Sequence, residues 1–434
     1  MRKGLCAAIV PAVLIFFGSC SSTPITAFSG NRVIPDDFTG VIHGSTNTEE
    51  ENAYLDYLGV KWILQTFNWS KIERKQGQWN FETFDILVDN LNAEGIKVLG
   101  VLAYDTKWLN AEGSAEDNIT ARELPYFLEY VKKTVGHYKG RVDAWCIWNE
   151  PNSSRFWKGS REDFFELTRH TAVAIREVDS DVKILGGAFN RGIFRLPKKF
   201  IKGLFESGAM DSVDAVAFHP YELNPARTLR LYDQFRKIVE GYGFGDRIWI
   251  TEVGYPTGGL YPTRVQEKIF PGYIIKTFVN LAAAGTPKLL WYELFDPHER
   301  SGRNSEHFFG LVRSTHEYTS KGAEAFRLCA NYLPGKNCYV LEPGQDGLPR
   351  SIRAFWFSPV QGSGNNSSAL VLWYEGVGSK QVRLRLPGTA VSRDPISGSE
   401  TAIPAETVIK AGKIPVFITW NSQDGEEKPI ILGK

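Results

Sequence analysis

Two glutamates each close an apolar, strand-like run of the sequence. Glu150 follows the apolar residues 142–148, and Glu252 follows the apolar residues 248–251, about 100 residues further along the chain. A pair of carboxyl groups from distant parts of a chain is what acid-assisted displacement at a sugar carbon requires. The pattern therefore points to cleavage of a glycosidic bond, provided that the fold brings both strand ends to the same place.

The chain has the alternation of strands and helices that such a fold needs. From about residue 39, short apolar runs alternate with amphipathic stretches such as 124–138, 164–178 and 229–239. Eight runs are candidate strands: residues 41, 60–67, 98–102, 142–148, 183–186, 213–218, 248–251 and 289–292. Strands separated by crossover helices pair in parallel, and eight such units close a barrel. We predict an α/β fold with a (β/α)8 TIM barrel over residues 38–332.

Alternation within the strands places polar groups at the carboxyl end of the barrel. Cys146, Trp148 and Glu150 share one face of the fourth strand, and Ala217 and His219 share one face of the sixth. In both strands the polar side chain comes last, at the barrel end where enzymes of this fold carry their chemistry.

Residues 333–434 have a different pattern. Short alternating runs at 352–357, 369–374, 382–386 and 416–420 are separated by Gly, Ser, Asn and Pro. This pattern predicts a smaller all-β, sandwich-like C-terminal domain. We expect it to be a structural domain packed against the barrel, with carbohydrate binding as the alternative.

The motif Trp148-Asn149-Glu150-Pro151 resembles that of the clan A glycoside hydrolases, whose barrels carry an acid/base in Asn-Glu-Pro after strand four and a nucleophilic Glu after strand seven. The resemblance covers about residues 38–330 and is closest to family 39, with family 5-like features. The sequence at residues 219–221 is similar to the clan's His-x-Tyr element. The segments at 69–73 and 77–81 are similar to one found after strand two in families 39, 42 and 5.

The resemblance implies a role for each matching residue. Glu150 would be the acid/base, with a raised pKa, and Glu252 the nucleophile, with the two carboxyl groups about 5 to 5.5 Å apart and configuration retained. The remaining implied or expected substrate contacts are Asn149 on the sugar 2-hydroxyl, His219 and Tyr221 of the His-x-Tyr element, and Trp291 as a sugar platform. Trp69 and Tyr104 follow strands directly and are further candidates for lining subsites.

We therefore predict a retaining β-glycoside hydrolase that cleaves an oligo- or polysaccharide through a glycosyl-enzyme intermediate. Two alternatives remain at this point. One is a surface lipoprotein that binds glycans without cutting them, and the other is a transglycosylase on the same scaffold.

The overall charge does not favour partners that are recognised by charge. The 50 basic and 49 acidic residues give a formal charge of +1 without charged blocks, which does not favour nucleic acid binding. No cysteine or histidine cluster has metal-ligand spacing, so we expect neither a metal nor another cofactor.

The first 19 residues have the layout of a secretory signal. Arg2 and Lys3 precede an apolar run from Leu5 to Phe17, and Cys20 follows in a segment that resembles a bacterial lipobox. We expect lipidation at Cys20, a tether over residues 20–37, and an exported protein attached to a bacterial membrane, in the periplasm or at the cell surface. A plain signal cleaved nearby and a short uncleaved anchor are the alternatives.

Three cysteines fall in the folded part of the sequence. Cys329 and Cys338 are close enough in sequence to form a disulfide across the intervening turn, or they remain free. Cys146 lies within an apolar strand and is expected to be a small buried side chain.

Overall fold

The computed structural model describes residues 32–42, 49–109, 118–192, 195–260, 264–296, 302, 304–313, 321–344, 346–361, 366–421 and 428–432. The predictions of a signal peptide over residues 1–19 and of lipidation at Cys20 lie outside the described residues.

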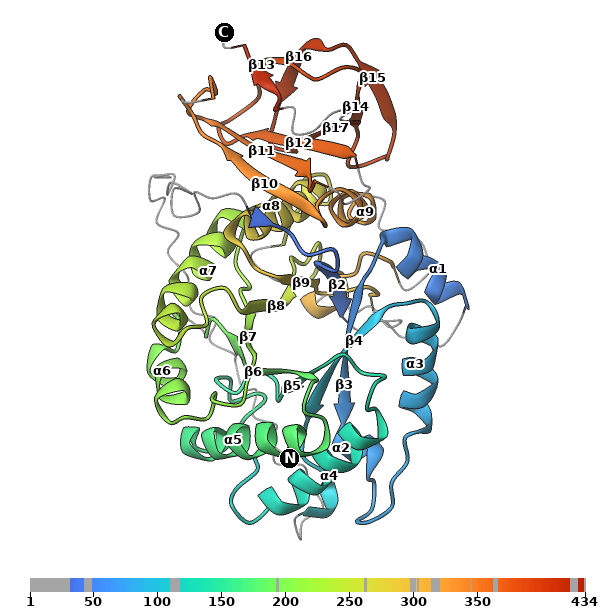
Figure 1. The fold of residues 1–434 in the computed structure, drawn as a ribbon, viewed down its shortest axis with the longest axis vertical. Coiled ribbons are helices and arrows are strands. Elements are labelled where there is room, and N and C mark those ends of the chain that lie inside the picture. The colour runs from blue at the N-terminus through green and yellow to red at the C-terminus, as the bar shows by residue number, and fades with distance from the viewer. Residues whose placement is uncertain are drawn as a thin grey trace, which may run out of the picture.

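Eight parallel strands close into a barrel, which confirms the predicted fold class (Figure 1). In order around the barrel they are β2 (Thr39–Ile42), β3 (Trp62–Asn68), β4 (Lys97–Ala103), β5 (Ala144–Ile147), β6 (Lys183–Asn190), β7 (Ala215–His219), β8 (Ile248–Val253) and β9 (Lys288–Trp291). Each overlaps one of the predicted strands. β9 pairs with β2, so the sheet has no free edge.

Helices surround the barrel and bury their apolar faces against it (Figure 1). They are α1 (Glu49–Leu58), α2 (Trp69–Ile72), α3 (Glu82–Ala93), α4 (Leu124–His137), α5 (Arg161–Val178), α6 (Lys198–Glu206), α7 (Pro225–Val239), α8 (Phe270–Ala284) and α9 (Ala323–Tyr332). Short 3-10 turns are η2 (Lys107–Leu109), η3 (Glu240–Tyr242) and η4 (Ser305–Phe308). No helix of the described residues is long and apolar enough to cross a membrane.

Capping residues determine where individual helices begin and end. α5 starts at a capping box, in which the Ser160 hydroxyl accepts from the Asp163 amide and the Asp163 side chain accepts from the Ser160 amide. α8 ends at Gly285, whose φ of 85° is a left-handed conformation that glycine adopts without a steric cost. These local features set the lengths of the loops that connect helices and strands.

The C-terminal region forms two antiparallel sheets, as the predicted sandwich-like domain requires. Seven strands form the larger sheet in the order β1 (Arg32–Val33), β10 (Lys336–Leu341), β11 (Ile352–Pro359), β12 (Ser367–Tyr374), β17 (Val416–Asn421), β14 (Ala390–Arg393) and β15 (Glu400–Ile403). The smaller sheet contains β16 (Glu406–Ala411), β13 (Lys380–Arg385) and β18 (Ile430–Ile431).

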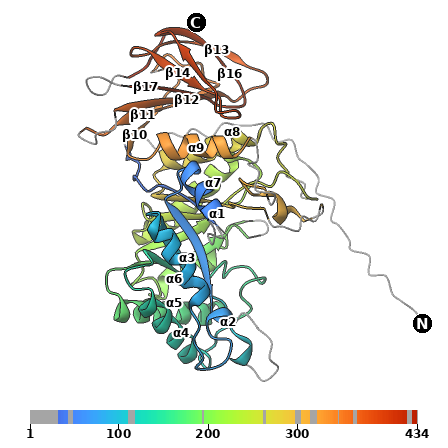
Figure 2. The same ribbon diagram turned by 90° about the vertical axis from the view of Figure 1, so that its right-hand side faces the viewer.

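The two faces of the larger sheet belong to different cores. Phe355 and Trp373 join the core of the barrel and its helices, whereas Trp356 and Trp420 join a separate core with the smaller sheet. Figures 1 and 2 show this domain stacked over α8 and α9. The tryptophans of the β domain are therefore packing residues, as expected for a structural domain.

The segment expected to be a tether contributes a strand. Within residues 20–37, β1 pairs antiparallel with β10, with Arg32 opposite Cys338 and Val33 opposite Asn337. The Ile34 amide continues the pairing by donating to the Lys336 carbonyl at 2.8 Å. The larger sheet thus takes an edge strand from the chain that precedes the barrel.

The structure does not contain the disulfide that was considered for Cys329 and Cys338. Both are free and buried, Cys329 on α9 and Cys338 on β10. Each packs as a small apolar side chain, and burial raises the pKa of the Cys338 thiol to about 12. Cys146 is also free and buried, as predicted.

Candidate active site

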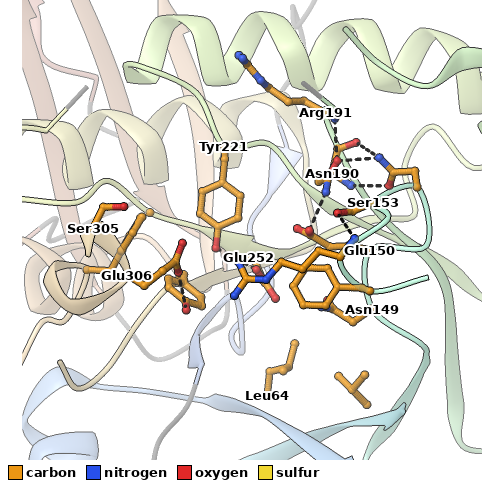
Figure 3. A pocket seen from close by; sticks show the side chains of 18 of the residues that line it. Leu64, Asn149, Glu150, Ser153, Asn190, Arg191, Tyr221, Glu252, Ser305 and Glu306 are labelled. Atoms are coloured by element: carbon orange, nitrogen blue, oxygen red, sulfur yellow. Dashed lines mark hydrogen bonds between the residues drawn. The ribbon is translucent and has the colours of Figure 1, made fainter. Parts of the chain in front are cut away.

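The carboxyl ends of the barrel strands open into a cleft of about 710 Å³. Glu150 and Glu252 both line this cleft, together with Asn149, Tyr104 and Tyr221. Figure 3 shows the two carboxylates facing the same space, with Tyr221 above Glu252. The barrel therefore brings together the two glutamates that are far apart in the sequence.

A sharp backbone turn directs Glu150 into the cleft. After β5 ends at Ile147, Trp148 and Glu150 adopt left-handed φ angles of 64° and 44°, which are costly for residues with side chains. The Trp148 ring is fully buried and its indole N–H donates to the Phe156 carbonyl at 2.9 Å. The Glu150 amide donates to the Ala188 carbonyl at 3.1 Å. These contacts hold the strained turn in place, as is common at functional sites.

Glu150 accepts hydrogen bonds at both carboxylate oxygens. His219 Nδ1 lies 2.9 Å from Oε1, and Asn190 Nδ2 donates to Oε2 at 2.6 Å. Burial acts to raise the pKa of Glu150, but the bond and charge of His219, the Asn190 bond and the charge of Arg155 bring it below the ordinary value. The prediction of a raised pKa is therefore wrong, because His219 and Asn190 reach Glu150 from other strands.

Glu252 is held by the phenol of Tyr221, which donates to Oε2 at 2.9 Å. Burial, together with the charge of Glu252, raises the pKa of Tyr221 well above its usual range, so the phenol keeps its proton and remains a donor. A donor of this kind favours the ionised form of the carboxylate that accepts from it.

His219 lies between the two carboxylates and is almost completely buried. Its Nδ1 is 2.9 Å from Glu150 Oε1 and 3.5 Å from Glu252 Oε2, and its Nε2 is 2.9 Å from Thr251 Oγ1. Burial acts to lower the pKa of His219, but the charge of Glu252 and the bond to Glu150 raise it above its ordinary value. The two carboxylates therefore favour the protonated form of the imidazole.

One ligand-type atom from each of Glu150, His219 and Glu252 lies within 4.8 Å of the others. Among the described residues this group has the spacing of a metal site. Both ring nitrogens of His219 are already hydrogen-bonded, and a protonated imidazole between two carboxylates accounts for the spacing without an ion. A carboxylate oxygen of Glu150 and one of Glu252 within 4.8 Å of each other are closer to the roughly 5 to 5.5 Å of retaining glycosidases than to the roughly 6.5 to 9.5 Å of inverting ones.

Asn149 and Tyr104 form a second polar contact in the cleft. Asn149 Nδ2 donates to the Tyr104 hydroxyl at 3.0 Å, and the Tyr104 ring stacks on Phe156 with centroids 6.1 Å apart. All three residues line the cleft. Their predicted contact with sugar is consistent with this position and stays a prediction.

Two predicted substrate contacts do not lie in the cleft. Trp69 is fully buried, with its indole N–H donating to Glu73 Oε2 at 2.7 Å and its ring stacked on Tyr130. It is the first residue of α2 and packs against Phe127 and Tyr130 of α4, because the chain turns into a helix directly after β3. The prediction that Trp69 lines a subsite is therefore wrong for this structure.

Trp291 is also fully buried, where it packs against Phe270 and Phe278 of α8. The next residue, Tyr292, lines the cleft instead. Successive side chains along a strand point to opposite faces, so a difference of one position exchanges core and cleft. The aromatic side chain available at this position of the cleft is Tyr292, and the prediction of Trp291 as a sugar platform is wrong.

Asn190 was missed from the sequence. It is the last residue of β6 and ends a strand with a polar group, as Glu150 does. The predicted strand ends at Gly186, whereas in the structure the pairing of β6 has an irregularity between Gly186 and Phe189, after which β6 continues. Asn190 also accepts from Asn152 Nδ2 at 2.7 Å through its side-chain oxygen, which fixes the orientation of its amide.

The fold and the site define a class of protein: a (β/α)8 barrel with carboxylates at the ends of its fourth and seventh strands, which is the arrangement of the clan A glycoside hydrolases. Residues 44–235 match the family described as "Glycosyl hydrolases family 39". The match lies within the barrel, so the chain is similar to this family over that part of its length.

Solved structures share the fold. A family 39 glycoside hydrolase from Bacteroides cellulosilyticus WH2 is 19% identical with a TM-score of 0.71, over 89% of this chain and 82% of that one. A monomeric beta-xylosidase from Caulobacter crescentus CB15 is 16% identical with a TM-score of 0.61, over 89% of this chain and 96% of that one.

Among curated proteins, an endo-1,4-beta-xylanase A from Phanerodontia chrysosporium is 30% identical over 165 residues, which cover 35% of this chain and 39% of the relative. A beta-xylosidase from Caldicellulosiruptor saccharolyticus is 38% identical over 64 residues, which cover 14% of this chain and 13% of the relative. The chain thus spans well under half the length of these two relatives.

Proposed function

We propose that this protein is a retaining β-glycoside hydrolase that acts by double displacement. The observation that carries the proposal is the position of Glu150 and Glu252 in one cleft, with a carboxylate oxygen of each within 4.8 Å. Two carboxyl groups at this separation leave no room for a water between enzyme and sugar, so one of them attacks the anomeric carbon directly. Binding without cleavage does not require such a pair.

The hydrogen bonds assign the two roles. Glu252 is the nucleophile, because the Tyr221 phenol stabilises its anion at 2.9 Å. Glu150 is the acid/base, because His219 lies 2.9 Å from its Oε1 and can deliver a proton to it. When a bound sugar excludes water from Glu150, its carboxylate is further desolvated, and transfer of the Nδ1 proton yields the carboxylic acid.

The two chemical steps follow from these roles. In the first, Glu252 Oε bonds to the anomeric carbon while Glu150 gives its proton to the departing glycosidic oxygen. In the second, Glu150 takes a proton from water, whose oxygen displaces Glu252 and releases the sugar. Two inversions at the same carbon retain its configuration.

The substrate that we propose is a β-1,4-linked xylo-oligosaccharide or xylan. Its support comes from relatives described as a beta-xylosidase and as endo-1,4-beta-xylanases. The cleft offers Tyr104, Tyr292 and Phe156 as aromatic surfaces that can face the C–H side of a sugar ring.

We also propose that the enzyme is exported and attached to a bacterial membrane through a lipid on Cys20. The support is the sequence alone, in which Arg2 and Lys3, the apolar run from Leu5 to Phe17 and Cys20 have the order of a lipoprotein signal. Mass spectrometry of the protein purified from a membrane fraction would test for acyl chains on Cys20.

Product analysis tests the proposed reaction. The purified protein is incubated with a panel of aryl β-glycosides that includes β-xyloside, and with xylo-oligosaccharides. We expect release of a β-anomer first, seen by ¹H NMR before mutarotation, since retention follows from two displacements. Release of the α-anomer first, or no release from any β-glycoside, would contradict the proposal.

A further inference from the structure

Arg155 places a positive charge in the cleft beside the catalytic carboxylates. The residue is exposed and lines the same cleft as Glu150 and Glu252. Within the part of the chain that the structure describes, it makes no ion pair. The other arginine of the cleft, Arg191, is paired with Glu222 at 2.6 Å. Among the described residues that line the cleft, Arg155 is therefore an arginine without an ion pair and is available to a ligand.

The loop that carries Arg155 is well ordered by hydrogen bonds. It connects Glu150 to α5, and the Phe156 and Trp157 amides both donate to the Ser153 carbonyl at 3.0 Å. The Phe156 carbonyl accepts from the buried indole of Trp148 at 2.9 Å. The guanidinium of Arg155 lies over the Phe156 ring, 5.1 Å from its centroid. The loop thus presents the charge from a fixed position next to the reacting groups.

The position of Arg155 identifies the part of the substrate that it faces. It follows the acid/base Glu150 by five residues on the same loop, and its charge is one of the influences on that carboxylate. An acid/base must lie beside the glycosidic oxygen that departs. Arg155 therefore lies near this oxygen, where the sugar on the leaving-group side is one of the two that it can reach.

We propose that Arg155 binds an anionic substituent, a uronic acid carboxylate, on the leaving-group sugar. The planar fork of a guanidinium matches the two oxygens of a carboxylate, and the Phe156 ring below it restricts its orientation. A sulfate ester shares the negative charge and is distinguished from a carboxylate by the test below. This inference rests on the proposed function, because it concerns the substrate of the same site.

The test compares matched substrates. One is a neutral β-linked oligosaccharide that the wild type cleaves; the second carries one uronic acid on the leaving-group side, and the third carries a sulfate there. We expect the wild type to show kcat/KM about tenfold higher for the uronic acid substrate than for the neutral one, and Arg155→Gln to abolish this preference. A higher preference for the sulfated substrate, lost in the same variant, would overturn the carboxylate assignment.

The ratio of kcat/KM for the anionic and the neutral substrate distinguishes recognition of the anion by Arg155 from an effect of Arg155 on Glu150. A change in the acid/base alters kcat/KM for both substrates alike, whereas loss of an anion contact alters only their ratio. Arg155→Lys, which keeps the charge, should retain part of the preference, and 1 M salt should reduce it in the wild type. Arg161→Gln, an exposed arginine outside the cleft, is the matched control and should leave the ratio unchanged.

The outcomes distinguish this inference from the proposed function. If no β-glycoside of any kind is cleaved, the proposed function fails and this inference fails with it. If the wild type cleaves neutral and anionic substrates equally well, or if Arg155→Gln leaves their ratio unchanged, the proposed function stands and the anionic subsite is rejected.

Discussion

The barrel carries a cluster of charged side chains at each end, and only one of the two lines the cleft. At the amino end, Asp37 accepts from Lys97 Nζ at 2.7 Å, from Lys288 Nζ at 2.6 Å and from the Trp62 indole at 3.2 Å. Burial acts to raise the pKa of Asp37, but the two lysines bring it below the ordinary value. One carboxylate thus accepts hydrogen bonds from two lysines and orients both of them.

At the carboxyl end the ratio of charges is reversed. Glu150 and Glu252 share one cation, His219, and both carboxylates face the cleft. The two carboxylates outnumber the histidine of this cluster, and their negative charge can stabilise the positive charge that develops on a sugar carbon during cleavage. The comparison shows two uses of similar components: one anion and two cations hold side chains together at the amino end, whereas two anions and one histidine face the cleft at the carboxyl end.

The largest effect should come from removing the nucleophile. Glu252→Gln keeps the size of the side chain and its contact with Tyr221 but cannot form the glycosyl-enzyme. We expect kcat to fall by at least about 10⁴-fold on every substrate, with little change in Tm. Steady-state kinetics and thermal unfolding of the same preparation measure both. A variant that keeps a tenth of wild-type activity would show that Glu252 does not react.

A smaller and substrate-dependent loss should follow removal of the acid. Glu150→Gln should lower kcat by about 10² to 10⁴-fold on oligosaccharides, whose leaving groups need a proton. On an aryl glycoside with an acidic phenol, the first step needs no proton, and a slow second step should let the intermediate accumulate. A burst of phenol release would report this, and equal losses on both kinds of substrate would reverse the roles given to the two glutamates.

The cluster at the amino end should affect stability and not chemistry. Asp37→Asn leaves Lys288 buried without its counter-charge, and we expect the free energy of unfolding to fall by about 2 kcal/mol. Activity per folded molecule should stay the same, because Asp37 lies at the opposite end of the barrel from the cleft. Urea unfolding and active-site titration check the two parts. Loss of activity in fully folded Asp37→Asn would remove the distinction between the two clusters.

The smallest effect concerns the pH dependence of stability. The raised pKa of His219 stabilises the fold fully below the unfolded value of 6.5, and this contribution is lost as pH rises through the folded pKa. The lowered pKa of Glu150 contributes above the unfolded value of 4.5 and is lost as pH falls through the folded pKa. The advantage of wild type over His219→Gln in unfolding free energy should therefore be greatest between about pH 4.5 and 6.5. A difference independent of pH would mean that His219 is not charged in the folded protein.

The sequence predicts the barrel because each strand is short, apolar and followed by a helical stretch. The same rule locates Glu150, His219 and Glu252, since each is a polar residue near the carboxyl end of an apolar strand. Parallel strands in a closed barrel end at the same rim, so the ends of β5, β7 and β8 must meet. Local sequence is sufficient for this part of the site.

Other parts of the site depend on contacts that local sequence does not contain. Tyr292 and not Trp291 lines the cleft, which is a difference of one residue along the strand. Asn190 reaches Glu150 only because β6 continues past an irregularity. The lowered pKa of Glu150 arises from His219, 69 residues away in sequence. The residues next to Trp69 in the sequence do not show that its side chain is buried. Its burial is seen only from the packing of α4 against it.

The pairing of β1 with β10 has a practical consequence for dissecting the enzyme. Cutting the chain before residue 38 and after residue 332 would isolate the barrel strands and helices. The first cut removes edge strand β1 from the β domain, and the second exposes the faces of α8 and α9 that this domain covers. Recombinant truncation at either boundary thus damages the module that it was meant to spare. The barrel and the β domain therefore share residues 32–34. A chimera that exchanges the β domain with that of a relative must include these residues with the C-terminal part.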